Sequence, residues 1–565
     1  RSDSAHSCVS SRGISWQGMV RLAALLCVLL LLLADARRTQ SKQCTAIQLD
    51  AGTTRLDLKG CGLARVPEHI DWCALKSLTF VDMSQNFLER IPTTLACATA
   101  IRVLFLSANP GLNHVPKFVR SLPSLKMYAQ RSSGLTSITA SDFPPSLEWL
   151  ILMDNALESL PDLSSFPIRK LMLSHNRLAS VGALPRALEM LSLANNRLRS
   201  LPESVRTAAR LTWVVLSSNP LLDDDAPPKP RLAVPELPLD QFPRLQTLAT
   251  NQDKSVVRSA VGGRRVAIKF FGARDSSGLP RHEVRMCGAV GDHHRNIINT
   301  LGVQLTPARR PAVALEFLDA DDGWAPMGGR PNFETITRGT FGPQHDHFSA
   351  AEIAHVGVLV ARALAELHAL GIVHGDVYAH NVMARARRGL TARAELKLGD
   401  FGTAMRLTPA LREQLLAWEV RAFGLMLDDM LIHSRPLRNP QLSRGLIQLK
   451  TEILAGGAQA GLTPVARMLN DLVAGWTAVQ GIWRDPSRTA AHRYNITVEG
   501  LLVSVNGRDV AGTEWNVFGF ANDDEGSFLF DFSPAGGSAG LDANYSRHSG
   551  TLHWGDGMTW ARTPP

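Results

Sequence analysis

The stretch His374–Asn381, HGDVYAHN, and the later Asp400–Gly402, DFG, decide how the second half of this 565-residue chain folds. An Asp followed five residues later by an Asn, and then by Asp-Phe-Gly, is the spacing of phosphoryl-transfer machinery. A carboxylate and an amide at these positions can converge on Mg²⁺, which prefers oxygen ligands. Gly375 stands where an Arg usually precedes the Asp. The motif therefore raises the question of whether this chain transfers phosphate or keeps only the outline of such a protein.

The segments around these motifs follow a fixed order along the chain. Strands are expected over 266–269 (VAIK), 312–318 and 395–400, and helices over 279–290 and 351–371. The order and the motifs resemble a protein kinase domain. The resemblance implies a bilobal α+β domain over residues 241–485, with ATP and Mg²⁺ as cofactors and a protein as substrate.

The same resemblance implies a role for each motif residue. Asp376 would accept or orient the proton of the substrate hydroxyl, while Lys269 contacts the ATP phosphates and Glu283 holds that lysine in place. Asn381 and Asp400 would be the metal ligands. The residues expected to bind the nucleotide are Lys269, Ala267, Glu316 and Leu318.

Residues 56–222 contain an internal repeat. The clearest copies are 147–161, 168–181 and 188–202, which fit L-x-x-L-x-L-x-x-N-x-L, and the asparagine position recurs every 20 to 25 residues. This is the period of leucine-rich repeats. We therefore expect an α/β solenoid over 44–222 whose exposed strand positions bind an unknown protein or peptide ligand. Those positions include Glu148, Trp149, Ile151, Lys170 and Met172.

A narrower resemblance joins the two parts. HGDVYAHNV and the segment 418–431, WEVRAFGLMLDDML, are similar to a family of kinase-like proteins that carry N-terminal leucine-rich repeats and have HGD in place of HRD. Only sixteen residues separate Gly402 from Glu419, and no Ala-Pro-Glu follows. A chain without a long activation loop has little use for the missing Arg. Phosphorylation of that loop is therefore not expected to switch the protein on.

The expected phosphate-binding loop departs from the kinase pattern. Residues 248–263 contain no G-x-G-x-x-G, and Ala249, Asn251 and Lys254 occupy the glycine positions. Side chains there would crowd the approach of backbone amides to phosphate. Three functions consequently stay open: an active Ser/Thr-type protein kinase, a pseudokinase scaffold that binds nucleotide without transfer, and a secreted leucine-rich repeat binding protein.

The N-terminal segment 19–36 has the form of a secretory signal peptide. Arg21 precedes thirteen apolar residues, 22–34, and an Ala-Asp-Ala cleavage pattern follows. The alternative is a membrane anchor with the C-terminal side in the cytoplasm, although thirteen residues fall short of a bilayer span. Cys44, Cys61, Cys73 and Cys97 follow, either as disulfides or as buried thiols. The chain is thus expected in the secretory pathway or at a membrane, where the sequons at Asn495 and Asn544 would matter.

The remaining segments are a linker and a tail. Residues 223–240 are rich in Pro and Asp and are typical of a semi-rigid linker. Residues 493–565 predict a small β-rich domain, with tight turns at Asn506-Gly507 and Asp556-Gly557 and a Trp554/Trp560 pair in its core. The net charge of +9 is dispersed, without a basic stripe, so no nucleic-acid partner is expected.

Overall fold

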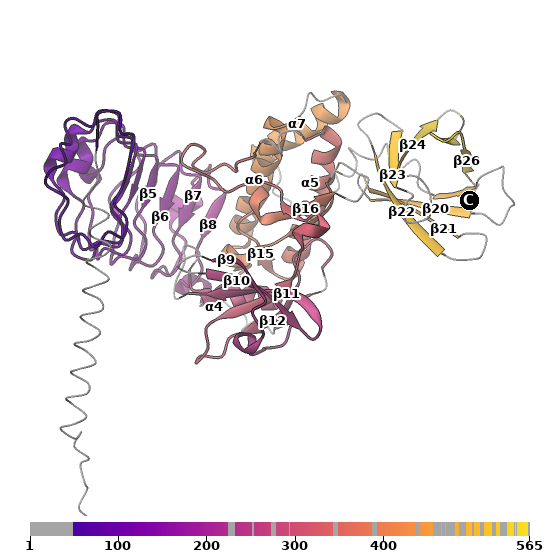
Figure 1. Ribbon diagram of the computed structural model, residues 1–565, viewed down its shortest axis with the longest axis horizontal. Coiled ribbons are helices and arrows are strands. Elements are labelled where there is room, and N and C mark those ends of the chain that lie inside the picture. Colours follow the sequence, from indigo (N-terminus) through magenta and orange to yellow (C-terminus); the bar gives the residue numbers. More distant parts are fainter. Residues whose placement is uncertain are drawn as a thin grey trace, which may run out of the picture. The chain divides into compact units, whose positions relative to one another are not determined.

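The computed structural model gives the arrangement of most of the chain after residue 48 (Figure 1). It describes residues 49–223, 232–250, 254–272, 278–292, 294–342, 348–386, 393–434, 440–455, 465, 469, 481–484, 493–499, 502–508, 514–521, 527–531, 539–546, 549 and 551–562. The expected signal segment 19–36 and Cys44 lie outside these residues. The chain divides into two compact units, one ending at Leu147 and one beginning at Glu148.

In the first unit, short parallel strands pair in chain order: β1 (Arg55–Asp57), β2 (Phe80–Asp82), β3 (Val103–Phe105) and β4 (Met127–Ala129). The 3-10 turns η1 (Thr93–Cys97), η2 (Lys117–Ser121) and η3 (Ala140–Asp142) lie between or after them. Cys73 and Cys97 form a disulfide, and Cys61 is also disulfide-bonded. Of the two alternatives for these three cysteines, the disulfides are the correct one.

The second unit begins with four more parallel strands, β5 (Trp149–Ile151), β6 (Lys170–Met172), β7 (Met190–Ser192) and β8 (Trp213–Val215). The short helices α2 (Glu203–Arg206) and α3 (Pro220–Asp223) accompany them. The repeated leucines point inward, and Leu191 and Leu193 are fully buried. Asn196 explains the recurring asparagine: its Nδ2 donates to the carbonyls of Leu173 and Leu193, and its Oδ1 accepts from the N–H of Leu178. The side chain thereby satisfies buried backbone groups where each strand ends.

A five-stranded antiparallel sheet follows, in the order β12-β13-β11-β10-β9. Its strands are β9 (Gln246–Thr250), β10 (Lys254–Val261), β11 (Arg264–Phe271), β12 (Thr300–Gln304) and β13 (Ala312–Glu316), with helix α4 (Pro280–Val290) and turn η4 (Leu239–Gln241). Residues from the segment expected to be a linker bond to this lobe. Ala233 N–H donates to Gly288 of α4, and Leu237 N–H donates to Val303 of β12.

A helical part follows the sheet and is built on α5 (Ala350–Ala369), α6 (Arg412–Ile432) and α7 (Pro440–Leu454), which lie side by side (Figure 1). Ser349 is the N-cap of α5, and its hydroxyl accepts a hydrogen bond from the N–H of Glu352. The short elements between the helices carry the catalytic motifs. They are η5 (Ala320–Asp322), β14 (Ala325–Pro326), β15 (Ile372–Val373), η6 (Ala379–Asn381), β16 (Val382–Ala386), β17 (Arg393–Leu398), η7 (Phe401–Thr403) and β18 (Met405–Arg406).

The tail is a closed antiparallel sheet in which consecutive strands pair and β19 also pairs with β26. The strands are β19 (Gly481–Arg484), β20 (Arg493–Glu499), β21 (Leu502–Arg508), β22 (Glu514–Ala521), β23 (Ser527–Asp531), β24 (Ala539–Ser546), β25 (Thr551–Trp554) and β26 (Thr559–Arg562). Strand β19 belongs to this sheet although the sequence placed it in the kinase-like range.

One of the two turns expected in the tail is wrong. Asn506 and Gly507 lie within β21, where Asn506 pairs with Asn516 and Gly507 with Trp515, because the long β21–β22 ladder overrides the local turn preference. Gly557 does lie in the turn between β25 and β26, with φ +89°. Trp554 and Trp560 are buried in contact, at 4.6 Å between ring centroids, and are core residues as expected.

Among the described residues, no helix has both the length and the apolar content needed to cross a membrane.

Candidate active site

Lys269, Glu283 and Asp400 meet although they come from three separate elements. Lys269 lies on β11 and extends its Nζ to Oε1 of Glu283 on α4, at 2.5 Å, and to Oδ1 of Asp400, at 3.1 Å. Asp400 follows β17 and has φ +63°, a conformation that turns its carboxylate toward the lysine. Lys254, at the start of β10, adds a second cation 3.4 Å from Glu283.

The electrostatics of this cluster follow from its burial. Burial opposes the charge of Lys269, but the carboxylates of Asp400 and Glu283 outweigh it and raise the pKa of the lysine. The ammonium of Lys269 holds the pKa of Asp400 well below its usual range. Burial raises the pKa of Glu283 despite its two lysine partners. The stable arrangement is therefore a charged Lys269 facing a charged Asp400.

Asp376 and Asn381 form a second cluster in the loop between β15 and β16. Nδ2 of Asn381 donates to Oδ2 of Asp376, at 2.8 Å, and to its carbonyl, at 2.9 Å. His374 is fully buried, and its Nε2 bonds the carbonyl of Gly399 while its Nδ1 accepts from the N–H of Asp376. The loop conformation is thus held on both sides of Asp376. Burial, and then the charge of Asp400, raise the pKa of Asp376.

Gly375 occupies a position that fits only glycine comfortably. Its φ is +75°, and a Cβ there would lie 2.8 Å from the carbonyl oxygen of Thr403. Its N–H donates to Oε1 of Glu419 on α6, at 2.8 Å, and the other oxygen of Glu419 bonds His368 of α5. Glu419 therefore fixes the backbone of the loop at Gly375 and links it to α5 and α6.

The other residues expected to bind the nucleotide lie on the paired strands β11 and β13 or just after β13. Ala267 on β11 pairs with Leu315 of β13. Glu316 is the last residue of β13, and Leu318 comes two residues later. Lys397 takes up the carboxylate of Glu316 in an ion pair of 2.6 Å. The side chain of Glu316 is thus engaged within the protein. Asn251, one of the residues in the expected phosphate loop, lies outside the described residues.

The oxygen donors of Asp400 and Asn381 suit Mg²⁺. Lys269 binds Oδ1 of Asp400, Arg330 approaches its Oδ2 only to 4.0 Å, and Asn381 uses its amide nitrogen toward Asp376. An oxygen of each residue can therefore still face a cation. No group of three His, Cys, Asp or Glu side chains able to hold a metal occurs in the described part of the chain. Two protein ligands, with nucleotide phosphates and water completing the shell, is the usual arrangement for this ion. When bound, Mg²⁺ would neutralise charge on the phosphates.

Strands β6–β8 pack against the catalytic loop. Tyr378, two residues after Asp376, is 4% exposed and lies in an apolar cluster with side chains of these strands. The other members are Met153, Met172, Met190, Ala194, Trp213 and Val215, with Ile151 packed alongside. Met172 was expected on an exposed ligand-binding face, but it is 6% exposed because it faces Tyr378.

Polar contacts fix the same interface. Arg169 forms a bidentate pair with Glu189, at 3.0 and 3.1 Å, and both bond the hydroxyl of Thr337 in the segment before α5. Arg421 of α6 donates to the carbonyl of Leu211, at 2.8 Å. Ion pairs and carbonyl contacts of this kind set orientation, while the apolar cluster supplies most of the stability.

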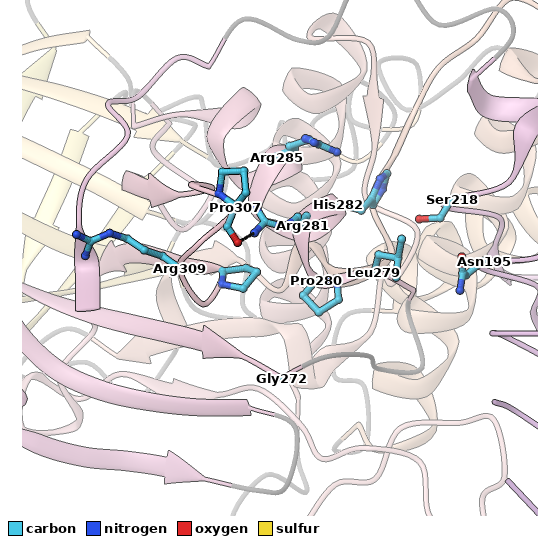
Figure 2. A pocket seen from close by; sticks show the side chains of 11 residues that line it. Asn195, Ser218, Gly272, Leu279, Pro280, Arg281, His282, Arg285, Pro307 and Arg309 are labelled. Carbon is cyan, nitrogen blue, oxygen red and sulfur yellow. Dashed lines mark hydrogen bonds between the residues drawn. The ribbon is translucent and has the colours of Figure 1, made fainter. Parts of the chain in front are cut away.

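A separate hollow of about 680 Å³ lies at the start of α4 (Figure 2). Arg281 and Arg309 line it, but Arg281 donates to the carbonyls of Thr306 and Pro307, and Arg309 pairs with Asp240. None of the catalytic or metal residues named above lines it. It is therefore not the phosphoryl-transfer site.

The comparisons agree with this geometry. The family model for the protein kinase domain matches residues 254–417, which span Lys269, Glu283, Asp376, Asn381 and Asp400. The chain contains a protein kinase domain. A kinase domain of this kind generally uses ATP and Mg²⁺ and acts on protein substrates. No curated protein matches the chain.

Three residues near the kinase site have roles that the motifs did not indicate. Tyr378 is the anchor for strands β6–β8, Lys170 lies on the strand that faces it, and Arg330 places its Nη2 4.0 Å from Asp400. Arg330 lies in a loop without a recognisable pattern. Lys170 was identified only as a possible ligand-binding position. No sequence motif relates Lys170 or Arg330 to the loop 374–381, because both residues are distant from it in the chain and come near it only in the folded structure.

Proposed function

We propose that this chain is an active, ATP- and Mg²⁺-dependent protein kinase that phosphorylates Ser or Thr. The observation that carries the proposal is the convergence of Lys269, Glu283 and Asp400, with Asp376 and Asn381 held in the adjoining loop. In this arrangement Lys269 binds the nucleotide phosphates, and Glu283 keeps its ammonium in place. Asp400 and Asn381 are the Mg²⁺ ligands.

Asp376 would act on the acceptor. Its Oδ2 is oriented by Asn381, and its backbone N–H is held by His374, so the carboxylate has a fixed direction. An ionised carboxylate in that position accepts a hydrogen bond from the substrate hydroxyl and receives its proton as the phosphoryl group is transferred. The short connection from Gly402 to α6 and the brace from Glu419 to Gly375 support a loop that is ordered without phosphorylation.

We also propose that the N-terminal parallel strands are leucine-rich repeats. The support is the recurring contact of Asn196 and its counterparts with the ends of neighbouring strands, and the buried Leu-x-Leu pairs. Met172 and Met190 are buried in the cluster with Tyr378 and are therefore not available to a ligand of these strands.

A nucleotide-binding scaffold without transfer activity is the second candidate. It is favoured by Lys254, which occupies an expected glycine position and pairs with Glu283, and therefore competes with Lys269 for the same carboxylate. Such competition weakens the preorganisation of Lys269 toward phosphate.

The compartment is a related proposal. The disulfide between Cys73 and Cys97 supports folding in the secretory pathway, since disulfides persist in oxidising compartments. Asn495 is exposed on β20 and accessible to glycosylation. Mass spectrometry of the protein from a eukaryotic secretory host tests this proposal, and an unmodified Asn495 together with reduced Cys73 would contradict it.

The decisive experiment is radiolabel transfer from ATP to a generic protein substrate by the purified full chain. Asp376→Asn should lower transfer by about 10²–10⁴ while nucleotide affinity stays nearly intact, because this carboxylate acts on the acceptor. Lys269→Met should damage both, since it removes charge from the phosphates. If the wild-type protein binds Mg-ATP but transfers no more label than Asp376→Asn, the scaffold is the correct function. Phosphoamino-acid analysis of the product distinguishes Ser or Thr from Tyr.

A further inference from the structure

Lys170 is an unusual lysine because it is half-buried and has no carboxylate partner. Its ammonium lies 4.1 Å from the ring centroid of Trp149 and makes no hydrogen bond or ion pair within the described residues. The lysines at the catalytic cluster, Lys254 and Lys269, are both paired with acidic groups. Burying a cation without a counter-charge costs free energy. A half-buried lysine that makes no ion pair and lies near a functional site is therefore a candidate ligand-binding group.

The position of Lys170 places it near the loop that carries Asp376, the residue proposed to act on the acceptor hydroxyl. It begins strand β6, two residues before Met172, which packs against Tyr378 of the catalytic loop. The neighbouring Arg169 anchors the same strand to Thr337. Lys170 also pairs in register with Met190 of β7, and Met172 and Met190 both lie in the cluster of Tyr378, which follows Asp376 by two residues. In agreement with this position, burial lowers the pKa of Lys170 to about 8 and the charge of Asp376 opposes the shift.

The catalytic loop itself offers no cation to a substrate. The loop from His374 to Asn381 contains neither lysine nor arginine. Lys269 faces the opposite side, toward Glu283 and Asp400. Positive charge near Asp376 therefore comes from outside the loop. Arg330 supplies one charge and lies 4.0 Å from Asp400. Lys170 on strand β6 supplies another and makes no ion pair within the described residues.

We propose that Lys170 is a specificity-determining residue of the kinase: its ammonium binds an anionic side chain of the protein substrate next to the acceptor hydroxyl. The inference rests on the proposed function, because it takes Asp376 as the group that receives the acceptor. The ligand chemistry is a carboxylate or a phosphate, both of which an ammonium binds as a point charge.

The test uses the full chain and a set of Ser peptides that differ only at the positions flanking the acceptor, which carry Glu, phosphoserine, Gln or Lys. The measured quantity is the ratio of kcat/KM for the acidic and the Gln peptide. This ratio cancels any loss of folded protein. We expect the wild-type protein to prefer the acidic peptide about tenfold at the best position, as a charge-assisted contact allows. The Glu and phosphoserine peptides show which anion is preferred.

Substitutions test whether Lys170 causes the preference for acidic peptides. Lys170→Met should reduce the ratio to about one, Lys170→Arg should keep most of it, and Lys170→Glu should favour the Lys peptide. Lys117→Met, an exposed lysine on η2, is the matched control and should leave the ratio unchanged. An unchanged ratio in Lys170→Met overturns the inference. So does a loss of preference in Arg330→Met but not in Lys170→Met, because the anion site would then belong to Arg330.

The failure of the inference can be told apart from that of the proposed function. Binding of the same peptides is measured by fluorescence anisotropy with Mg²⁺ and a non-hydrolysable ATP analogue, which needs no transfer. If no label is transferred but the acidic peptide binds more tightly and Lys170→Met removes the difference, the kinase activity is refuted and the Lys170 site stands. Transfer or binding without any acidic preference in the wild-type protein overturns the Lys170 site alone.

Discussion

The backbone N–H of Gly375 donates a 2.8 Å hydrogen bond to the carboxylate of Glu419, and no side chain can be added to Gly375 without meeting the carbonyl of Thr403. The glycine that replaces the usual Arg is therefore part of how the loop is built. Glu419 of α6 thereby holds the backbone of the HGD motif.

The first prediction concerns this glycine. Gly375→Ala should destabilise the protein by about 1–2 kcal/mol for the left-handed backbone, with about 1–3 kcal/mol more from the clash with Thr403. Gly371→Ala is the matched control, since Gly371 has φ +73° and open space around its Cβ position. Urea unfolding of both variants measures the difference. Equal midpoints for the two would mean that Thr403 does not constrain the loop.

The second prediction concerns the proposed metal ligands. Asp400→Asn should weaken the Mg²⁺-dependent part of ATP binding by about 10–100-fold, because one anionic oxygen donor is lost and Lys269 keeps only Glu283 as a partner. Calorimetric titration with and without Mg²⁺ measures this. The matched control is Asp321→Asn, which makes the same substitution at an exposed position and should leave Mg²⁺-dependent ATP binding unchanged. The metal assignment fails if Asp400→Asn binds Mg-ATP as tightly as the wild-type protein.

The third prediction concerns the repeat core. Leu191→Asp with Leu193→Asp places two charges in fully buried positions and should cost more than about 4 kcal/mol. Arg197→Asp with Arg199→Asp keeps the same spacing on an exposed stretch of the next segment and should change stability little. Thermal unfolding of the full chain compares the pairs. An unchanged transition in the leucine pair would contradict the inward direction of the Leu-x-Leu positions.

The fourth prediction concerns pH. Because the pKa of Lys170 is about 8, its charge is present below that pH and lost above it, so the preference for acidic peptides should fade as the pH rises through 8. Lys170→Arg should keep its preference to higher pH, since a guanidinium stays protonated. The charged or titratable groups around Lys170 are Glu148, Arg169, Glu189, Arg330, Asp376 and His380. The measurement is the kcat/KM ratio across the pH range, and an alkaline loss that persists in Lys170→Arg would contradict the assignment.

Motif spacing predicted the part of the site that lies within the kinase domain. Lys269, Glu283 and Asp400 were identified from the sequence and do meet, because the order of elements around them determines one packing of sheet and helix. The packing of Tyr378 against strands β6–β8 could not be predicted from motif spacing. Periodicity shows which face of a strand is apolar, but it does not show that residues 172 and 378, far apart in the chain, cover each other.

Local preference failed where long-range pairing was stronger. Asn506-Gly507 is a typical hairpin turn, yet it lies inside β21 because its neighbours pair on both sides. Strand β19 was missed because four residues, Gly481–Arg484, become a strand only through their pairing with β20 and β26. Both cases show tertiary hydrogen bonding deciding what a short segment becomes.

A recognition array joined to an enzyme is ordinarily regarded as a pair of exchangeable modules. The burial of Tyr378 among Met172, Met190 and Trp213 instead packs strands β6–β8 against the loop of the kinase domain that carries Asp376. Inserting or deleting one repeat after Lys170 would bring a different strand opposite Tyr378 and would carry the ammonium away from Asp376. If the strands are leucine-rich repeats as proposed, the number of repeats is free to change before β5, whereas the stretch from β5 to the kinase domain has a length set by packing on Tyr378.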